Sequence, residues 1–151
     1  MSAEDNKAIA RRYWDEGWST GNVAMVDEIF APDNSFHPPQ RTTAIRGTET
    51  QKQGFTRWRT AIPDLRATIE DIFAEGDKVV VRWTIRGTNQ GNIEIESGET
   101  IPPTGKHVSF AGMDIYHCRG GKIVERWRSW DRLGLTMTDI LQELGVVPKA
   151  G

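Results

Sequence analysis

The feature that most constrains the fold is a change in the spacing of apolar residues at Arg66. Before this residue, apolar side chains recur every three or four positions, which is typical of amphipathic helices. After it, they alternate with polar ones, which is typical of β-strands with one buried face. Helices followed by consecutive hairpins predict an α+β fold, in which an antiparallel sheet curls around helices on one face.

The helical part of the chain has end signals for three helices. Gly21 ends the first, because glycine favours the backbone conformation that follows a helix. Pro32 stops the second, and the sequence TETQ at residues 48–51 has the form of a capping box that begins the third. We predict helices near residues 3–19, 22–31 and 48–62.

The alternating part contains two hairpins, so at least four strands are expected. The first hairpin turns at residues 75–77, and the second runs from His107 to Trp130 around a glycine turn. Between them, residues 89–105 are rich in Gly, Pro and Thr and predict a connection that can act as a lid over one end of the sheet. A closing helix is expected over residues 132–145.

Length and charge narrow the possible functions. The 151 residues, 37% hydrophobic and 26% charged, fit one soluble domain covering residues 1–151. With 19 Lys and Arg against 21 Asp and Glu, and no run of basic residues, we expect no nucleic-acid partner. No apolar run approaches membrane-spanning length and no signal-peptide core is present, so we expect a cytoplasmic protein that has no membrane partner.

The sequence lacks the motifs of metal and cofactor sites. Cys118 is the only cysteine, which excludes an intrachain disulfide and a thiolate cluster, and we interpret it as an apolar filler. His107 and His117 have no partner at metal-ligand spacing. The chain contains no HExxH, CxxC, GxGxxG, Walker loop or GxSxG elbow. We therefore predict neither a metal nor a cofactor.

The second hairpin carries charged residues among its apolar ones, and its register decides which of them share a face. A two-residue glycine loop would pair Asp114 with Trp127. A three-residue loop at residues 119–121, with a glycine bulge, would place Asp114 across from Arg126 and near Arg128. We favour the second register, because a buried carboxylate needs a cationic partner. One face then holds Asp114, Tyr116, Val124, Arg126 and Arg128, and the other holds Met113, Ile115, Glu125 and Trp127.

Asp114 and Arg128 are the candidate catalytic pair. At the bottom of a largely apolar pocket, the acid would move a proton and the guanidinium would stabilise a developing oxyanion. The alternative is a structural ion pair, since paired charges are common on sheet faces. Asp131 is the second-ranked carboxylate, because strand alternation points it away from Arg128.

Further residues are candidates for substrate binding. Trp18 and Trp58 each lie toward the end of a predicted helix that should cover the sheet, although large aromatic residues are also common in any core. His37 precedes two prolines that hold the chain extended, so its ring can point inward; the alternative is a solvated loop histidine. Tyr116 and Arg126 share the polar face of the second hairpin.

The other face of this hairpin predicts how the protein assembles. Met113, Ile115 and Trp127 form an apolar patch that is too large to leave in water comfortably. We expect two copies to pack sheet against sheet as a homodimer.

Ten short segments occur in the order and spacing of one known family. Through them the chain resembles the SnoaL-like polyketide (ester) cyclases of the nuclear-transport-factor-like superfamily, over nearly its whole length. The resemblance implies a cone-shaped α+β domain, in which a curved sheet wraps around three N-terminal helices and leaves one deep pocket. The segments are AIARRYWDEGWSTGN, VDEIFAPD, SFHPP, IRGTE, VVVRWTIRGTNQG, PPTGK, GMDIYH, GKIVERW, WD and QELG.

The resemblance also implies a chemistry. Characterised cyclases of this kind close a polyketide ring by an intramolecular aldol step without a cofactor, using an aspartate five residues after the Ile of GKI and a histidine on the neighbouring strand. In this chain those positions hold Arg128 and Asp114, so the aldol mechanism does not transfer intact. Facing Asp and Arg residues also resemble part of the Asp-Arg-Asp site of limonene epoxide hydrolases, which activates water and protonates an epoxide.

Three functions remain open. The first is a cofactor-independent cyclase or isomerase that uses acid–base chemistry on a polyketide-like or other ring-forming molecule, small and hydrophobic or polycyclic. The second is a hydrolase or hydroxylating accessory enzyme with the same pocket. The third is a non-catalytic small-molecule-binding protein. A pair of Asp114 and Arg128 buried in the pocket favours an enzyme, and an exposed pair favours the third function.

Overall fold

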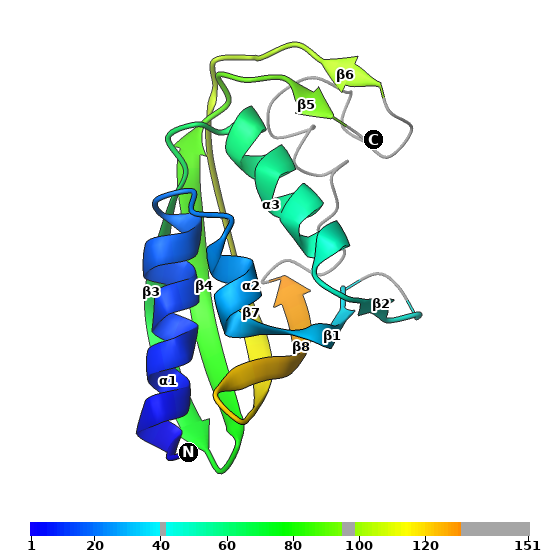
Figure 1. Ribbon diagram of the computed structural model, residues 1–151. Coiled ribbons are helices and arrows are strands. Elements are labelled where there is room, and N and C mark those ends of the chain that lie inside the picture. Colours follow the sequence, from blue (N-terminus) through cyan, green and yellow to red (C-terminus); the bar gives the residue numbers. More distant parts are fainter. Residues whose placement is uncertain (40–41, 95–98, 131–151) are drawn as a thin grey trace.

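The computed structural model describes residues 1–39, 42–94 and 99–130, with helices followed by strands (Figure 1). The helical segments are α1 (Ala3–Arg12), the π-helix η1 (Tyr13–Trp18), α2 (Met25–Ile29) and α3 (Glu49–Ala61). The strands are β1 (Phe30–His37), β2 (Ile45–Arg46), β3 (Arg66–Glu75), β4 (Lys78–Thr88), β5 (Ile93–Glu94), β6 (Thr100–Ile101), β7 (His107–Arg119) and β8 (Lys122–Trp130).

Six of the strands form one sheet in the order β2-β1-β8-β7-β4-β3, and β5 and β6 form a separate short hairpin. The predicted α+β class with a curved sheet is confirmed. The sheet is mixed rather than wholly antiparallel, because β1 joins it beside β8 in the parallel direction. This pairing places the end of β1 next to the charged residues of the last hairpin.

The helices follow the predicted segments with one change. Helices α1 and η1 together cover Ala3 to Trp18, and α3 agrees with the third prediction. Helix α2 is shorter than the predicted 22–31, because Phe30 already has extended backbone angles and begins β1, which continues through Pro32. The predicted capping box at residues 48–51 is not formed, since Thr48 makes no side-chain hydrogen bond to the helix.

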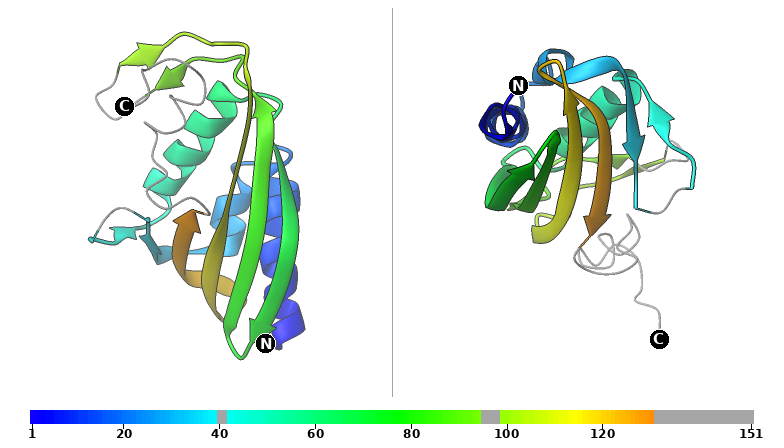
Figure 2. Two further views of the ribbon diagram at one scale, coloured as in Figure 1. Left: turned by 180° about the vertical axis from the view of Figure 1, so that it is seen from behind. Right: turned by 90° about the horizontal axis from the view of Figure 1, so that it is seen from below.

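Helix α3 lies on the concave side of the sheet, and the view from below in Figure 2 shows β8 and β1 curving around it. Helix α1 packs against β3 and β4 at the other end of the sheet. The helices therefore cover different parts of the same face, and η1 lies between them along the chain.

An aromatic stack holds the first helical segment onto the sheet. The Trp14 ring lies 5.0 Å from Trp83 of β4 and 5.9 Å from Trp18, in nearly parallel planes. Tyr13 packs edge-on against Phe30, with ring centroids 4.9 Å apart. Large aromatic side chains bury much apolar area each, so this cluster accounts for a large part of the core.

The hairpin of β7 and β8 has a register different from the predicted one. Its turn has two residues, and a bulge follows between His117 and Cys118, so Asp114 lies opposite Arg128 instead of Arg126. The predicted and observed registers differ by two residues on β8, which keeps most side chains on their expected faces. At the bulge the predicted face is wrong. Val124 was predicted to share the face of Asp114, but the fully buried residue is Ile123.

The connection between the two hairpins is more ordered than a simple lid. It contains β5 and β6, and the buried Asn89 ties its ends together by donating to the carbonyls of Ala61 and Gly91 and accepting from Thr104. Residues 95–98 of this connection, the predicted closing helix at 132–145, and Asp131 lie outside the described residues.

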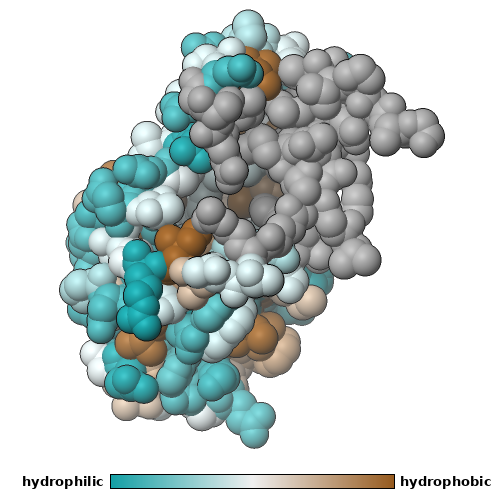
Figure 3. All heavy atoms as spheres, turned by 90° about the vertical axis from the view of Figure 1, so that its right-hand side faces the viewer, coloured by the Kyte–Doolittle hydropathy of each residue, from teal (hydrophilic) through white to brown (hydrophobic). Residues whose placement is uncertain are grey.

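The described surface is mainly polar on the side shown in Figure 3, where hydrophobic residues form small separate groups among hydrophilic ones. Within the described residues, no helix combines the length and apolar character needed to cross a membrane.

Candidate active site

A cavity of about 260 Å³ opens between α3 and the β1–β8 part of the sheet. Helix α3 supplies Phe55 and Trp58 to its wall, and η1 supplies Trp18. Phe36 comes from β1, and Arg126 and Arg128 come from β8. Aromatic rings together with arginine side chains suit a ligand that is flat, apolar and oxygen-bearing.

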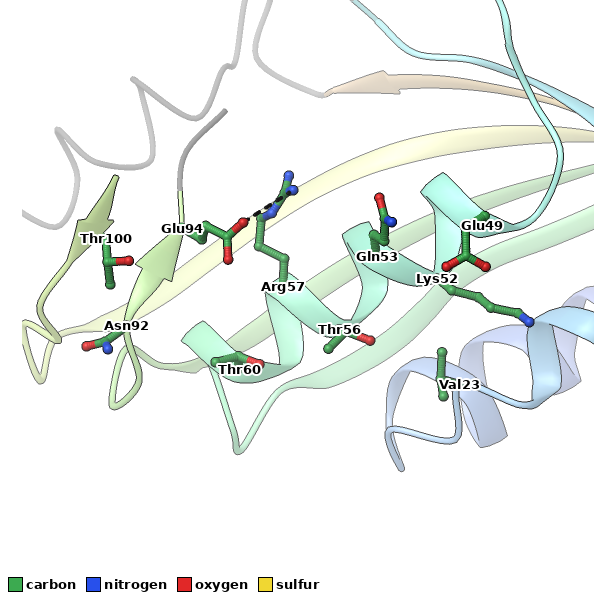
Figure 4. A pocket seen from close by; sticks show the side chains of 10 residues that line it. All are labelled: Val23, Glu49, Lys52, Gln53, Thr56, Arg57, Thr60, Asn92, Glu94 and Thr100. Atoms are coloured by element: carbon green, nitrogen blue, oxygen red, sulfur yellow. Dashed lines mark ion pairs between the residues drawn. The ribbon is translucent and has the colours of Figure 1, made fainter. Parts of the chain in front are cut away.

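A larger depression of about 790 Å³ lies on another side of α3 (Figure 4). Its side chains are mostly polar, and three of its charged ones are paired: Lys52 bonds Asp27 at 2.6 Å, and Arg57 lies 4.0 Å from Glu94. The buried charged residues Asp114, Arg126 and Arg128 do not line it. We therefore place the candidate site in the smaller cavity.

Asp114 and Arg128 form a two-pronged ion pair beneath this cavity. Arg128 donates from Nε to one carboxylate oxygen at 2.8 Å and from Nη2 to the other at 2.9 Å. The Asp114 side chain is fully buried, and that of Arg128 is 9% exposed. Strand pairing sets this geometry, because the two residues lie directly opposite each other on β7 and β8.

Two aromatic side chains complete the hydrogen bonding of Asp114. Tyr116 donates its hydroxyl proton to the carboxylate at 2.7 Å, and the indole nitrogen of Trp83 donates at 3.2 Å. Trp14 in turn donates to the Tyr116 hydroxyl at 2.8 Å. The carboxylate therefore accepts bonds on both oxygens from groups that are fixed in the core.

These contacts set the ionisation of the cluster. Burial alone would raise the pKa of Asp114, but the charges of Arg128 and Arg126 and the bonds from Arg128 and Tyr116 outweigh it, so the pKa lies below the ordinary 3.8. Burial and the Asp114 charge raise the pKa of Tyr116 well above 10.0. Asp114 is thus a carboxylate, and Tyr116 a neutral phenol, at neutral pH.

The chemistry available at the cavity wall is hydrogen-bond donation. The described lining residues include three arginines, Arg57, Arg126 and Arg128, but no Asp, Glu or His. Asp114 lies behind Arg128 and is not part of the wall. The catalytic role expected for Asp114 and Arg128 stays a prediction, in which Arg128 lines the cavity and Asp114 lies against Arg128 from behind.

The other predicted site residues have three different placements. Trp18, Trp58 and Arg126 line the cavity, and Tyr116 lies behind it with Asp114. His37 does not belong to the cavity. It stacks on Trp127 with centroids 5.1 Å apart and bonds Glu125 at 2.7 Å, on the opposite face of the sheet.

Some lining residues escaped sequence reasoning. Phe36 precedes His37 in the same extended segment, and strand alternation allows only one of the two to face inward. The parallel pairing with β8 places Phe36 beside Arg126, a partner that hairpin patterns do not reveal. Gln51 was considered only as part of a capping box, and the structure places it among the lining residues of the cavity.

Within the described residues, no group of three or more His, Cys, Asp or Glu side chains comes close enough to hold a metal ion.

Comparison with known families gives one match by sequence. The sequence pattern of the SnoaL-like polyketide cyclases matches residues 8–138. Among curated proteins no match was found.

Solved structures give a consistent fold. IdmH of Streptomyces antibioticus, a candidate polyketide cyclase, is 28% identical over 93% of this chain and 99% of its own, with a TM-score of 0.73. A candidate polyketide cyclase of Acidithiobacillus ferrooxidans is 29% identical over 95% and 99%, with a TM-score of 0.72. AclR of Streptomyces galilaeus, a candidate hydroxylase, has a TM-score of 0.79 at 24% identity over 99% and 87%, which shows the fold alone.

Proposed function

Since the chain belongs to the family of SnoaL-like polyketide cyclases, we propose that it is a cofactor-independent cyclase or isomerase acting on a polyketide-like, ring-forming molecule. The observation that carries this proposal is the pair of Asp114 and Arg128. A buried, rigidly held guanidinium at the wall of an apolar cavity is suited to stabilise negative charge on a substrate oxygen.

Arg128 acts as the electrophile in this proposal. Ring closure by aldol addition begins when a carbon next to a carbonyl loses a proton to water, and negative charge then develops on the carbonyl oxygen. The carbon of this enolate then bonds to a second carbonyl carbon, whose oxygen takes a proton back from water, so the atoms of the substrate are conserved. Donation from Arg128 lowers the energy of this enolate more than that of the neutral ketone, which is the condition for catalysis. Asp114 is a positioning residue, because its two bonds keep the guanidinium plane in one orientation.

The test is turnover of a tetraketide or longer β-ketoester, followed by mass spectrometry in the presence of a chelator. Cyclisation by addition leaves the mass unchanged, or lowers it by one water. Arg128→Lys should lower turnover by about two to three powers of ten, because an ammonium cannot reproduce the planar fork.

A matched control comes from the outer face of the sheet. Arg82 pairs with Asp71 at 2.7 Å across neighbouring strands, and both side chains are exposed. Arg82→Lys should leave turnover unchanged. If Arg128→Lys turns over substrate as fast as the native protein, the proposed role of Arg128 is rejected. If only Asp131→Asn loses all activity, the catalytic residue is Asp131 instead.

A hydrolase or hydroxylating enzyme is the second candidate. The facing Asp and Arg are the observation that favours it, since limonene epoxide hydrolases combine these residue types with a second carboxylate. The cavity wall that is described offers no such carboxylate. A product that gains one water or one oxygen atom would favour this function, and binding without any product would favour a carrier.

A further inference from the structure

A second arginine in the same cavity has no role in the chemistry proposed above. Arg126 is 3% exposed and lies opposite Tyr116 on the sheet. Its Nη1 donates to the Tyr13 hydroxyl at 3.1 Å, and its guanidinium lies 3.8 Å from the centroid of the Phe36 ring. Neither partner carries a negative charge.

The charge of Arg126 lacks a carboxylate of its own among the described residues. Its nearest one is Asp114, 4.0 Å away, and both oxygens of Asp114 already accept bonds from Arg128. An arginine keeps its positive charge in proteins, and a buried charge is costly unless an opposite charge and hydrogen bonds compensate it. Aromatic rings supply only part of this compensation.

Three groups at the cavity have buried polar atoms without a partner in the described part of the chain. They are Nε of Arg126, the indole nitrogen of Trp18 and the side-chain amide of Gln51. Buried polar groups in folded proteins are nearly always hydrogen-bonded, so unpaired ones on three residues that line one cavity favour a missing ligand atom. The Arg126 and Trp18 groups can only donate, which means that the missing atom is an acceptor.

We propose that Arg126 and Trp18 form an anion subsite, and that the natural ligand is a ring-bearing molecule with an anionic oxygen, as in a carboxylate or the enolate of a 1,3-dicarbonyl. Phe36 and Phe55 would hold the apolar part of the ligand, since both line the cavity beside these donors. The inference rests on the proposed function in placing the ligand in the same cavity. It extends that function by naming the charge of the substrate.

The experiment compares two probes of nearly the same shape, 2-naphthoate and 2-naphthamide, by calorimetry on the full chain at neutral pH and low salt. The native protein should bind the naphthoate about tenfold or more tightly than the amide, which is the scale of a hydrogen bond to a charged group. Arg126→Met should abolish this preference. Trp18→Phe should reduce it, because phenylalanine keeps the aromatic wall and removes only the N–H donor.

Arg82→Met, on the outer face, is the control for general charge attraction and should keep the full preference. If Arg126→Met does not fold, as judged by circular dichroism, the native protein and Trp18→Phe still decide the question. Equal affinity for the two probes, no binding of either, or a preference that Trp18→Phe leaves intact would overturn the anion subsite. The calorimetry measures binding and not turnover, so a result that overturns the anion subsite leaves the cyclase proposal standing. Conversely, a confirmed subsite in a protein without turnover would reject only the proposed cyclase activity.

Discussion

At the scale of single residues, Asp114 shows why a charged group can be buried at all. A carboxylate without partners in the core would cost far more than a folded domain can spare. Here Arg128 supplies the opposite charge, and Tyr116 and Trp83 supply further donors, so the ionised form is the stable one. The arrangement is stable only as a complete set, which makes it sensitive to the loss of one member.

Asp114→Asn should lower the free energy of unfolding by about 3 to 5 kcal/mol, because it removes the buried negative charge to which Arg128 donates two hydrogen bonds. Denaturation in urea, followed by circular dichroism, measures this change. Asp71→Asn removes the exposed partner of Arg82 and should cost less than about 1 kcal/mol. Equal costs for the two variants would mean that the buried pair contributes no more than a surface pair.

The same residue predicts how stability depends on pH. Because the pKa of Asp114 is below 3.8 in the folded protein, its ionisation stabilises the fold at every pH above that value. The contribution is lost as the pH falls below 3.8 and through the lowered pKa. The difference in unfolding free energy between the native protein and Asp114→Asn should therefore be constant near neutral pH and shrink in acid. A difference that stays constant throughout the acid range would contradict the lowered pKa.

The sequence predicted which strand face carries Asp114 and Arg128 better than it predicted which residues these two side chains contact. The predicted register placed Asp114 and Arg128 on one face, and this placement survives in the structure because the observed register differs by two residues, which keeps the face. The bulge beside Cys118, which places Arg128 rather than Trp127 opposite Asp114 after a two-residue turn, has no sequence signal. Likewise, the pKa of Asp114 is set by burial, which raises it, and by the charges of Arg128 and Arg126 and the bonds from Arg128 and Tyr116, which together lower it by more, and no sequence pattern predicts this balance.

At the scale of elements, the ends of the helices depend on local hydrogen bonds. Ser2 caps α1: its hydroxyl accepts from the Asp5 N–H at 3.1 Å, and the Asp5 carboxylate accepts from the Ser2 N–H at 3.0 Å. Thr48 stands at the same position before α3 without such a bond. Similar sequence patterns thus contribute differently to stability, because the Ser2 side chain accepts a hydrogen bond from the helix backbone and that of Thr48 does not.

Ser2→Ala should destabilise the protein by about 1 kcal/mol, the usual cost of losing a helix cap. Thr48→Ala should change stability much less, since no capping bond is lost. Urea midpoints of the two variants compare them directly. A Thr48 variant that costs as much as the Ser2 variant would indicate that the capping box forms in solution.

The sequence predicted whether a segment is a helix where its apolar periodicity extends over several turns. It did not predict the end residues of the helices as well. Residues 3–18 and 49–61 repeat their apolar positions over several turns, and the structure has helices there. Helix α2 has a single turn before Phe30, and the pairing of β1 with β8 continues the chain as a strand. A tertiary contact of this kind outweighs the weak helical preference of a few residues.

At the scale of the whole molecule, the outer face of the sheet suggests how copies associate. Phe73, Val80, Ile115, Trp127 and His37 lie in one cross-strand row over five strands. Phe73 is 59% exposed and Ile115 39%, and a continuous apolar row is an unusual surface for a monomer. Charges of both signs flank the row, among them Lys78 and Glu125, so the face can complement itself across a two-fold axis.

We propose that a second copy of the chain covers this face, and that Ile115→Lys produces a monomer. Light scattering of the native protein at micromolar concentration should give the mass of a dimer. Val23→Lys, which places the same charge at an exposed aliphatic residue away from the sheet, should remain dimeric. A monomeric native protein would refute the proposed interface, and a dimer that survives Ile115→Lys would place the interface elsewhere.

The parallel pairing of β1 with β8 has a consequence for the order in which the molecule folds. His37 and Glu125, bonded across these strands, are 88 residues apart, whereas β7 and β8 meet through a tight turn. Contacts between distant residues form late, because closing a long loop costs entropy before any contact repays it. While the chain emerges from the ribosome, β1 can pair only with the two-residue β2 until β8 has been synthesised. We therefore expect the wall of the cavity that β1 and β8 form to be completed late, so that a ligand that fills the cavity binds chains that have finished folding.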